Sequence, residues 1–361
     1  MSADVETMAY RNQVPWHGMG EYIGDVVTPQ EMQAKAKLEW KVSKKPIYFK
    51  SDITGLAKQA KNSYLLVRSS DESDLGTCTD TYKPIQNDEI FEFFTKFAEA
   101  GNMQMETAGS LDSGRIVWGL AKLNSASFTI GNGDKTDMYL LMSSGHRVGF
   151  AYQMDLTSIR VVCMNTLRMA RQKKATDGSR FRMTHSATWD DSKKREAELL
   201  VTNAMTATAA YELKAKQLLG QKVNRAINEV FVVELLQPNL LVKAIENSKI
   251  SSILRDNPKN FMRTHGDVVL QEIMARESLV LDSDMFTLPV RRILDNIDKQ
   301  PGNELSPNTM WNTFNGVTHY IDHQAGYKRD SGLKSAWYGT GANVKTDALE
   351  LAVEYTSRLQ R

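Results

Sequence analysis

The chain has 361 residues, of which 41% are hydrophobic and 24% charged, a composition typical of a globular protein with a large core. Its 45 basic residues nearly balance its 43 acidic ones, which excludes a wholly basic binder, so any contact with nucleic acid must come from local clustering of charge. Two cysteines exclude a disulfide framework and a four-thiolate zinc site. No apolar run is long enough to span a bilayer, and the first residues lack the pattern of a signal peptide, so we expect a reducing cytosol and no membrane partner.

The first hundred residues predict short strands and two helices. Thr28-Pro29-Gln30-Glu31 predicts a helix running to about Leu38, because threonine caps a helix start and proline suits its first turn. Asn87 is expected to cap a helix over 88–100, whose phenylalanines we assign to the core. Strands are expected at 40–49, 64–69 and 77–82. We interpret the lysines of the first strand as a solvated edge: Lys41, Lys44 and Lys45.

Residues 103–162 are the most strand-rich part of the sequence. Asp112-Ser113-Gly114 predicts a hairpin turn between strands at 103–111 and 115–123. Further strands are expected at 138–142 and 148–154. Because these strands lie close together in the sequence, we expect a mostly antiparallel sheet.

Positive charge is concentrated in the segment that follows. Ile159–Cys163 has the composition of a strand, and Asn165 is expected to start a helix through Leu167–Lys174, followed by a turn at Asp177-Gly178. Only one acid, Asp177, accompanies the basic residues of this segment, which are Arg160, Arg168, Arg171, Lys173, Lys174, Arg180 and Arg182. One interpretation is a groove for single-stranded nucleic acid, in which these cations hold phosphates and Phe181 stacks on a base. The alternatives are a solvated helix end, whose cations complement the helix dipole, and a basic protein–protein surface.

The remainder of the chain is predicted to be mainly helical. A long helix is expected to end at Gly220 and another to run over 223–236, with proline breaks further on and a linker at 300–308. The sequence thus predicts an α+β protein, with a mostly antiparallel, strand-rich N-terminal part followed by a helical C-terminal part. We divide it into residues 1–185, 186–300 and 301–361.

The best candidate for a metal site is the pair His319 and His323. These residues are one helical turn apart, as a site with two histidine ligands requires. Tyr320 stands where a zinc protease has its glutamate, and the sequence shows no third ligand nearby. A polar helix face is the simpler interpretation, and we assign no metal and no cofactor.

Several motifs together resemble those of the phage/plasmid-like proteins, a family that carries a domain of unknown function. The central signature runs from Leu140 through Ser143-Ser144-Gly145-His146 to Ile159-Arg-Val-Val-Cys-Met-Asn-Thr-Leu167. Other matching stretches are Pro15-Trp16-His17-Gly18-Met19-Gly20, Tyr82–Asn87, Thr184-His185, Val317-Thr-His-Tyr-Ile-Asp-His323 and Ser335–Gly341. The chain departs from the family loop, usually similar to Ser-His-Asp-Gly, with Ser144-Gly145-His146-Arg147. The resemblance implies a phage or plasmid origin and action in the cytoplasm of the host bacterium.

From the basic segment and this resemblance we expect a phage DNA-metabolism protein that binds single-stranded DNA without sequence preference. Single-strand annealing or recombination by a homo-oligomeric ring or filament is the expected activity, and it needs no covalent chemistry. Two other classes remain open, a metal-dependent nuclease and a non-catalytic phage assembly or host-interaction protein.

Overall fold

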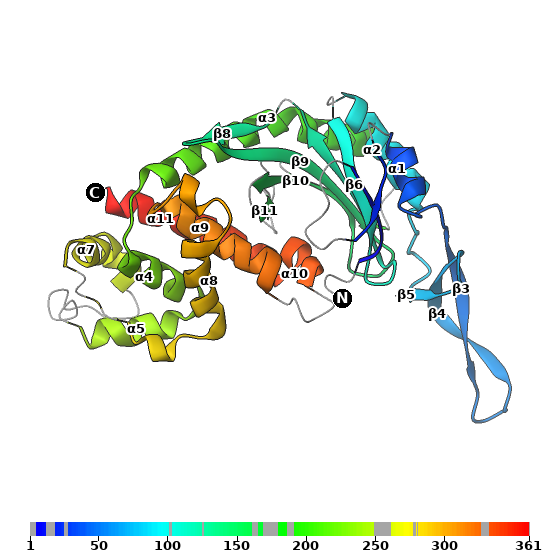
Figure 1. Ribbon diagram of the computed structural model, residues 1–361. Coiled ribbons are helices and arrows are strands. Elements are labelled where there is room, and N and C mark those ends of the chain that lie inside the picture. The colour runs from blue at the N-terminus through cyan, green and yellow to red at the C-terminus, as the bar shows by residue number, and fades with distance from the viewer. Residues whose placement is uncertain are drawn as a thin grey trace.

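The computed structural model describes residues 5–11, 19–24, 28–100, 103–124, 126–160, 165–168, 180–185, 191–248, 261–276, 279, 281–325 and 332–360. A curved, mostly antiparallel sheet arches over a group of C-terminal helices, and a narrow two-stranded arm projects from the body (Figure 1). The fold is therefore α+β, with strands in the N-terminal half and helices in the C-terminal part, as the sequence predicts.

The main sheet has the strand order β11-β10-β9-β7-β6-β1-β2, with β8 paired to β9 and β12 paired to β10. The predicted hairpin around Asp112–Gly114 joins β6 to β7, and Asp112, Ser113 and Gly114 all have positive φ. Only β1 and β2 pair in parallel among the pairings of the described strands. The strands are β1 (Val5–Tyr10), β2 (Glu21–Tyr22), β6 (Met103–Leu111), β7 (Ile116–Leu123), β8 (Phe128–Ile130), β9 (Asp134–Gly145), β10 (Tyr152–Arg160), β11 (Asn165–Arg168) and β12 (Arg180–Met183).

Alternate residues of the central strands face two different apolar cores. In β9, Met138, Leu140 and Met142 belong to the larger core, whereas Leu141 belongs to a smaller core on the other face. This is the period of two that a strand buried on both faces requires. On the outer side of the arch α1 (Pro29–Lys35) and α2 (Asn87–Ala100) contact β6, and α3 (Asp191–Gly220) contacts β8 and β12 (Figure 1).

The C-terminal helices pack together beneath the arch. Helix α11 contacts α7, α9 and α10, and α8 contacts α4 and α9. The segment 300–308, predicted as a linker, is packed against the body, since the carbonyl of Gly302 accepts a hydrogen bond from Arg160. These helices are α4 (Arg225–Leu236), α5 (Pro238–Glu246), α7 (Phe261–Arg276), α8 (Leu288–Lys299), α9 (Met310–His319), α10 (Gly332–Tyr338) and α11 (Thr340–Leu359), with short turns η2 (Ser283–Met285), η3 (Asn303–Leu305) and the π-helical η4 (Tyr320–Gln324).

Two local predictions are corrected by the structure. Asn165 begins strand β11, not a helix, because residues 165–168 pair with β10 and extend the sheet by one strand. Asn87 is at the start of α2 but its side chain is turned inward, where Nδ2 donates to the carbonyls of Leu38 and Trp40. In contrast, the predicted cap at Thr28 is confirmed, with a reciprocal capping box between Thr28 and Glu31.

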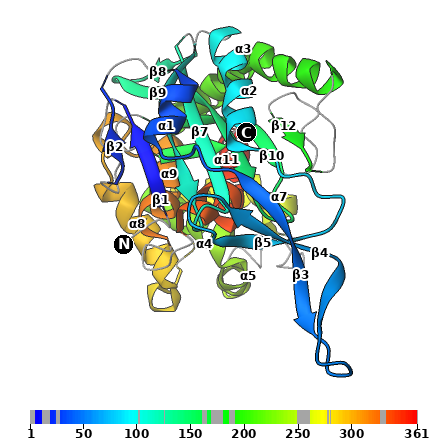
Figure 2. The ribbon, with the colours of Figure 1, turned by 90° about the vertical axis from the view of Figure 1, so that its right-hand side faces the viewer.

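The arm is part of a second sheet, with the order β3-β4-β5. Its strands are β3 (Val42–Lys50), β4 (Ala57–Arg68) and β5 (Asp74–Cys78). Strand β5 pairs only with the lower part of β4, from Tyr64 to Val67, so the outer part of the arm is a two-stranded ribbon. Figures 1 and 2 show this ribbon extending well beyond the body of the molecule.

Candidate nucleic-acid interface

The outer part of the arm is basic and exposed on both faces. We call Lys45, Lys50, Lys58 and Lys61 the arm lysines. Lys45 lies opposite Leu65 in the three-stranded lower part, and the other three lie in the two-stranded outer part. All four are exposed, and no carboxylate among the described residues pairs with them. Asp52 is the only acid of residues 42–68. The arm lysines therefore present positive charge that the described part of the chain does not neutralise.

Large apolar side chains accompany these charges. Tyr48 is 58% exposed and Phe49 is 53% exposed, and because neighbouring residues of a strand point to opposite faces, each face of the ribbon carries one ring. Phe49 lies opposite Lys58 in the register, and Tyr48 is two residues from Lys50. The turn adds Ile53, which is 93% exposed, and Leu56, which is 69% exposed. An isolated hairpin gains little stability from such residues, so packing within the chain does not explain them.

The base of the arm is held firmly by polar contacts. Lys44 Nζ donates to the backbone carbonyls of Thr79, Asp80 and Tyr82, at distances of 3.0, 2.7 and 3.1 Å. Arg68 Nε donates to Asp71, and Arg68 Nη1 forms a 2.6 Å ion pair with Glu6 of β1. The hydrogen bonds from Arg68 hold the pKa of the Asp71 carboxyl well below its usual range. Lys44 thus anchors the arm, whereas the four exposed arm lysines are available to a ligand.

A cleft of about 250 Å³ lies beside the arm base. We define it by three segments that line it: Thr79, Thr81 and Tyr82 after β5, residues 148–151 before β10, and Arg182, Thr184 and His185 at the end of β12. Arg182 is exposed, and none of the described carboxylates pairs with it. Since Lys44 bonds to the first of these segments, the cleft and the arm are neighbouring parts of one surface.

Two buried histidines, His146 and His185, lie at or near the cleft. His185 stacks on Tyr82, with ring centroids 4.5 Å apart, and its Nε2 lies 3.0 Å from the carbonyl of Phe150. Behind it His146 is fully buried, with Nε2 2.8 Å from Asn87 Oδ1. Because the amide of Asn87 donates through Nδ2, its Oδ1 accepts, and we assign the proton of His146 to Nε2. Burial lowers the pKa of His146 to about 3, so this imidazole is neutral and serves packing.

The structure brings three of the predicted arginines to one edge of the main sheet. Residue 168 of β11 and residues 180 and 182 of β12 lie opposite Thr157, Asp155 and Gln153, which are successive positions two residues apart along β10. Such positions are roughly 7 Å apart and lie on one face. Of these three, the side chain of Arg182 is described and is exposed. The predicted positions Arg171, Lys173 and Lys174, and the predicted turn at Asp177-Gly178, lie outside the described residues, as do residues 12–18 of the Pro15–Gly20 motif.

Arg160 and Phe181 do not belong to this edge. Arg160 is 3% exposed, and its guanidinium binds Asp134, which is 1% exposed and also accepts from Trp311 Nε1 at 2.8 Å. Phe181 is fully buried and packs against Tyr152, with ring centroids 5.9 Å apart. Alternation along β12 explains this, because Phe181 and Met183 point inward where Arg182 and Thr184 are exposed. The predicted phosphate contact by Arg160 and the predicted base stacking by Phe181 are therefore wrong, because both side chains are buried.

The histidine pair lies at the end of α9 and in η4. The rings of His319 and His323 are 4.6 Å apart, and burial, with His323 nearby, lowers the pKa of His319 to about 4. Their neighbour Asp322 is taken up by a buried ion pair with Lys345 Nζ, at 2.7 Å. Across the described residues, no group of three or more His, Cys, Asp or Glu side chains is arranged to hold a metal ion.

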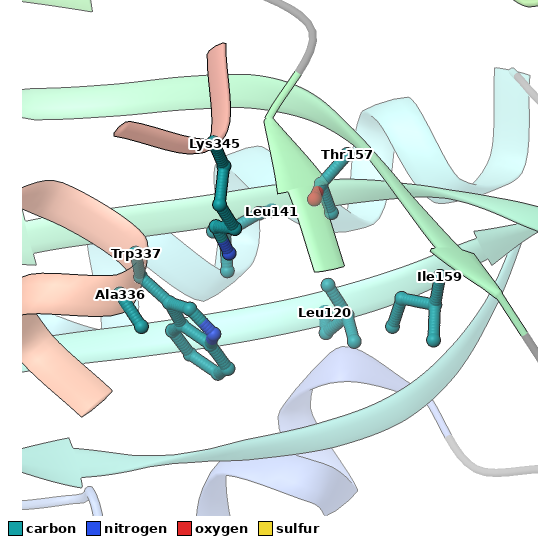
Figure 3. A pocket seen from close by; sticks show the side chains of 7 residues that line it. All are labelled: Leu120, Leu141, Thr157, Ile159, Ala336, Trp337 and Lys345. Carbon is teal, nitrogen blue, oxygen red and sulfur yellow. The ribbon is translucent and has the colours of Figure 1, made fainter. Parts of the chain in front are cut away.

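A small cavity lies where α10 and α11 meet the inner face of the sheet. Figure 3 shows Lys345 and Trp337 from the helices facing Leu120, Leu141 and Ile159 from the strands. The enclosed space is about 20 Å³, room for about one water molecule. We therefore regard it as a packing defect next to the Lys345–Asp322 ion pair and not as a ligand site.

The arm is the feature that sequence reasoning missed. The sequence interpretation assigns a solvated edge to Lys41, Lys44 and Lys45 alone, and it does not pair their strand with a long partner strand. A signal was present, since residues 41–63 contain six lysines and one acid, interleaved with Tyr48, Phe49, Ile53 and Leu56. Apolar and basic residues at the tip of a hairpin far from a core indicate a binding surface.

Comparison with known proteins identifies the family of this chain. The family model described as "Domain of unknown function (DUF932)" matches residues 74–338, well over half of the chain. No curated protein and no solved structure matches the chain. None of the helices in the described parts of the chain has the length and apolar character needed to cross a bilayer.

Proposed function

We propose that this chain, which belongs to the DUF932 family of domains of unknown function, binds single-stranded DNA without sequence preference and supports annealing or recombination. The observation that carries the proposal is the projecting arm, with four exposed lysines and two exposed aromatic rings, and with no acid of the described residues paired to these lysines. Lysines neutralise phosphates of any sequence, and aromatic rings stack on any base.

The distribution of the rings favours a single strand over a duplex. A ring can stack only on a base whose face is free, and in a duplex the base faces are covered by their neighbours. A two-stranded ribbon can also enter the major groove of a duplex, but there it reads base edges through polar side chains. The ring of Phe49 has no group that can form a hydrogen bond with a base edge, and the ring of Tyr48 has only its hydroxyl. The chemistry of the arm therefore fits an unpaired strand better.

The edge arginines extend the proposed path. Arg182, together with the register positions of Arg168 and Arg180, lies along β12 and β11, and the cleft connects this edge to the arm base. Binding and annealing need no covalent step. A phage or plasmid origin and a place in the host cytoplasm are parts of the proposal that rest on the sequence resemblance. A ring or filament, in which successive arms follow one strand, is the assembly that annealing would need.

A fluorescence anisotropy titration tests the proposal. Labelled single-stranded and duplex DNA of the same length are titrated with the full chain at two salt concentrations, without divalent metal. We expect tighter binding to the single strand and an affinity that falls with salt, as it must when cations replace counterions on phosphates. Absence of binding at low salt would refute the proposal, and an equal affinity for both forms would remove the role of the aromatic rings.

A further inference from the structure

The cleft beside the arm base has the size and lining of a site for one nucleotide. Its volume of about 250 Å³ is just below the roughly 300–1,000 Å³ of pockets for drug-sized ligands, so it suits a single flat heterocycle. Val148, Phe150 and Ala151 line it with apolar surface, and hydroxyls of Thr79 and Thr81 lie in another wall. An apolar cleft with a few polar groups on one side is the usual arrangement for an aromatic ring with polar edges.

The walls of the cleft are fixed before any ligand arrives. The backbone N–H of Lys83 donates to the carbonyl of His185 at 3.0 Å, and the hydroxyl of Tyr82 donates to the carbonyl of Gly145 at 3.1 Å. His185 in turn contacts the carbonyls of Lys83 and Phe150. These hydrogen bonds connect all three lining segments. The cleft is therefore preorganised, and little binding energy is needed to order its walls.

The charge at the mouth identifies the second half of the ligand. Arg182 lines the cleft, is exposed and is not paired with any described carboxylate. A guanidinium can hold two oxygens of a phosphate at once. An aromatic heterocycle beside a phosphate is a nucleotide, whereas an apolar peptide or a lipid chain would leave the guanidinium of Arg182 without a partner.

We propose that the cleft is a nucleotide subsite, in which one base of the strand lies against Phe150 and its phosphate is held by Arg182. This assignment rests on the proposed function, because the strand that supplies the nucleotide is the one bound by the arm. It adds a fixed point of contact to a surface that otherwise recognises only charge and stacking. A strand held there by one base would be positioned in register with the edge of the sheet.

A monomeric ligand tests the cleft separately from the arm. Thymidine 5′-monophosphate is titrated against the full chain by saturation-transfer NMR, with deoxyribose 5-phosphate as the ligand without a base. We expect saturable binding with a Kd of about 1 mM or tighter. Removing the base should weaken binding roughly tenfold, since a stacked base contributes on this scale.

Variants assign the site. Arg182→Gln should weaken thymidine monophosphate roughly tenfold, and Lys243→Gln, an exposed lysine of α5, should change nothing. Phe150→Leu, which keeps most of the volume, should remove the preference for the ligand with a base. A variant with all four arm lysines changed to Gln should still bind the monomer like the wild type.

The outcomes separate the two proposals. Strand binding without saturable monomer binding, or with monomer affinity unaffected by Arg182→Gln, would overturn the nucleotide subsite and leave the arm intact. Monomer binding sensitive to Arg182→Gln in a protein that binds no strand would support the subsite and refute the proposed function.

Discussion

Removing the charge of Asp134 is expected to destabilise the protein, because Asp134 forms a buried ion pair with Arg160. Arg160 donates through Nε and Nη2 to Asp134, at 2.8 and 2.7 Å, and through Nη2 to the carbonyl of Gly302. Asp134→Asn preserves the shape of the side chain and removes its charge, so the buried guanidinium of Arg160 loses this ion pair. We expect a loss of about 3–5 kcal/mol in the free energy of unfolding, a large part of the roughly 5–15 kcal/mol typical of a protein.

Urea denaturation followed by tryptophan fluorescence measures this loss, and Trp311, which donates to Asp134, is a suitable reporter. The surface pair Lys299 and Asp295, both more than half exposed, supplies the control. Asp295→Asn should cost less than about 1 kcal/mol. The double variant Asp134→Leu/Arg160→Met should recover much of the stability, because it removes both charges together.

A cost below about 1 kcal/mol for Asp134→Asn would refute the structural role of the pair. Reduced affinity for single-stranded DNA in a folded Arg160→Met variant would show that Arg160 belongs to the interface after all. We expect that affinity to be unchanged.

Three further predictions concern the arm, the buried histidine and the sheet. Tyr48→Ala and Phe49→Ala should each weaken single-strand binding by about 1–3 kcal/mol at constant salt slope, as measured by anisotropy, because they remove stacking and leave charge. His146 has a folded pKa of about 3, below the roughly 6.5 of the unfolded chain, so the unfolded state binds the proton first as the pH falls. The free energy of unfolding should therefore fall between pH 6.5 and pH 3, by up to roughly 1.4 kcal/mol per pH unit. Urea titrations over this range should show a weaker pH dependence for His146→Gln. Gly109→Ala would place Cβ 2.4 Å from the carbonyl oxygen of Thr7, so thermal denaturation should show a loss of about 1–3 kcal/mol or more.

The elements with a clear periodicity were predictable from the sequence. The hairpin around Asp112–Gly114, the cap at Thr28 and the helix ending at Gly220 follow from local rules, and the structure confirms them. The segment after β10 was not predictable in this way. Asn165 is a good helix cap, but residues 165–168 gain a ladder of hydrogen bonds to β10, a tertiary interaction that local propensity does not contain.

The sequence also does not show which of the predicted site residues are exposed. A count of charges finds Arg160 and Arg182 together, yet only burial separates the arginine that binds Asp134 from the one that faces solvent. Similarly, the inward position of Phe181 depends on the register of β12 against β10, which the sequence leaves open. The arm lysines form a candidate binding surface because the hairpin projects from the body (Figure 1), and this projection depends on the whole fold.

The most direct test of the account is the salt dependence of single-strand binding by the variant in which all four arm lysines are changed to Gln. Each lysine that neutralises a phosphate contributes about 0.7 to the slope of log K against log salt, so the variant should lose up to about 2.8 units of slope and bind far more weakly. A control with four exposed lysines changed elsewhere (Lys37, Lys214, Lys222 and Lys243) should retain the slope and affinity of the wild type. An unchanged slope in the arm variant, with the protein folded, would contradict the account.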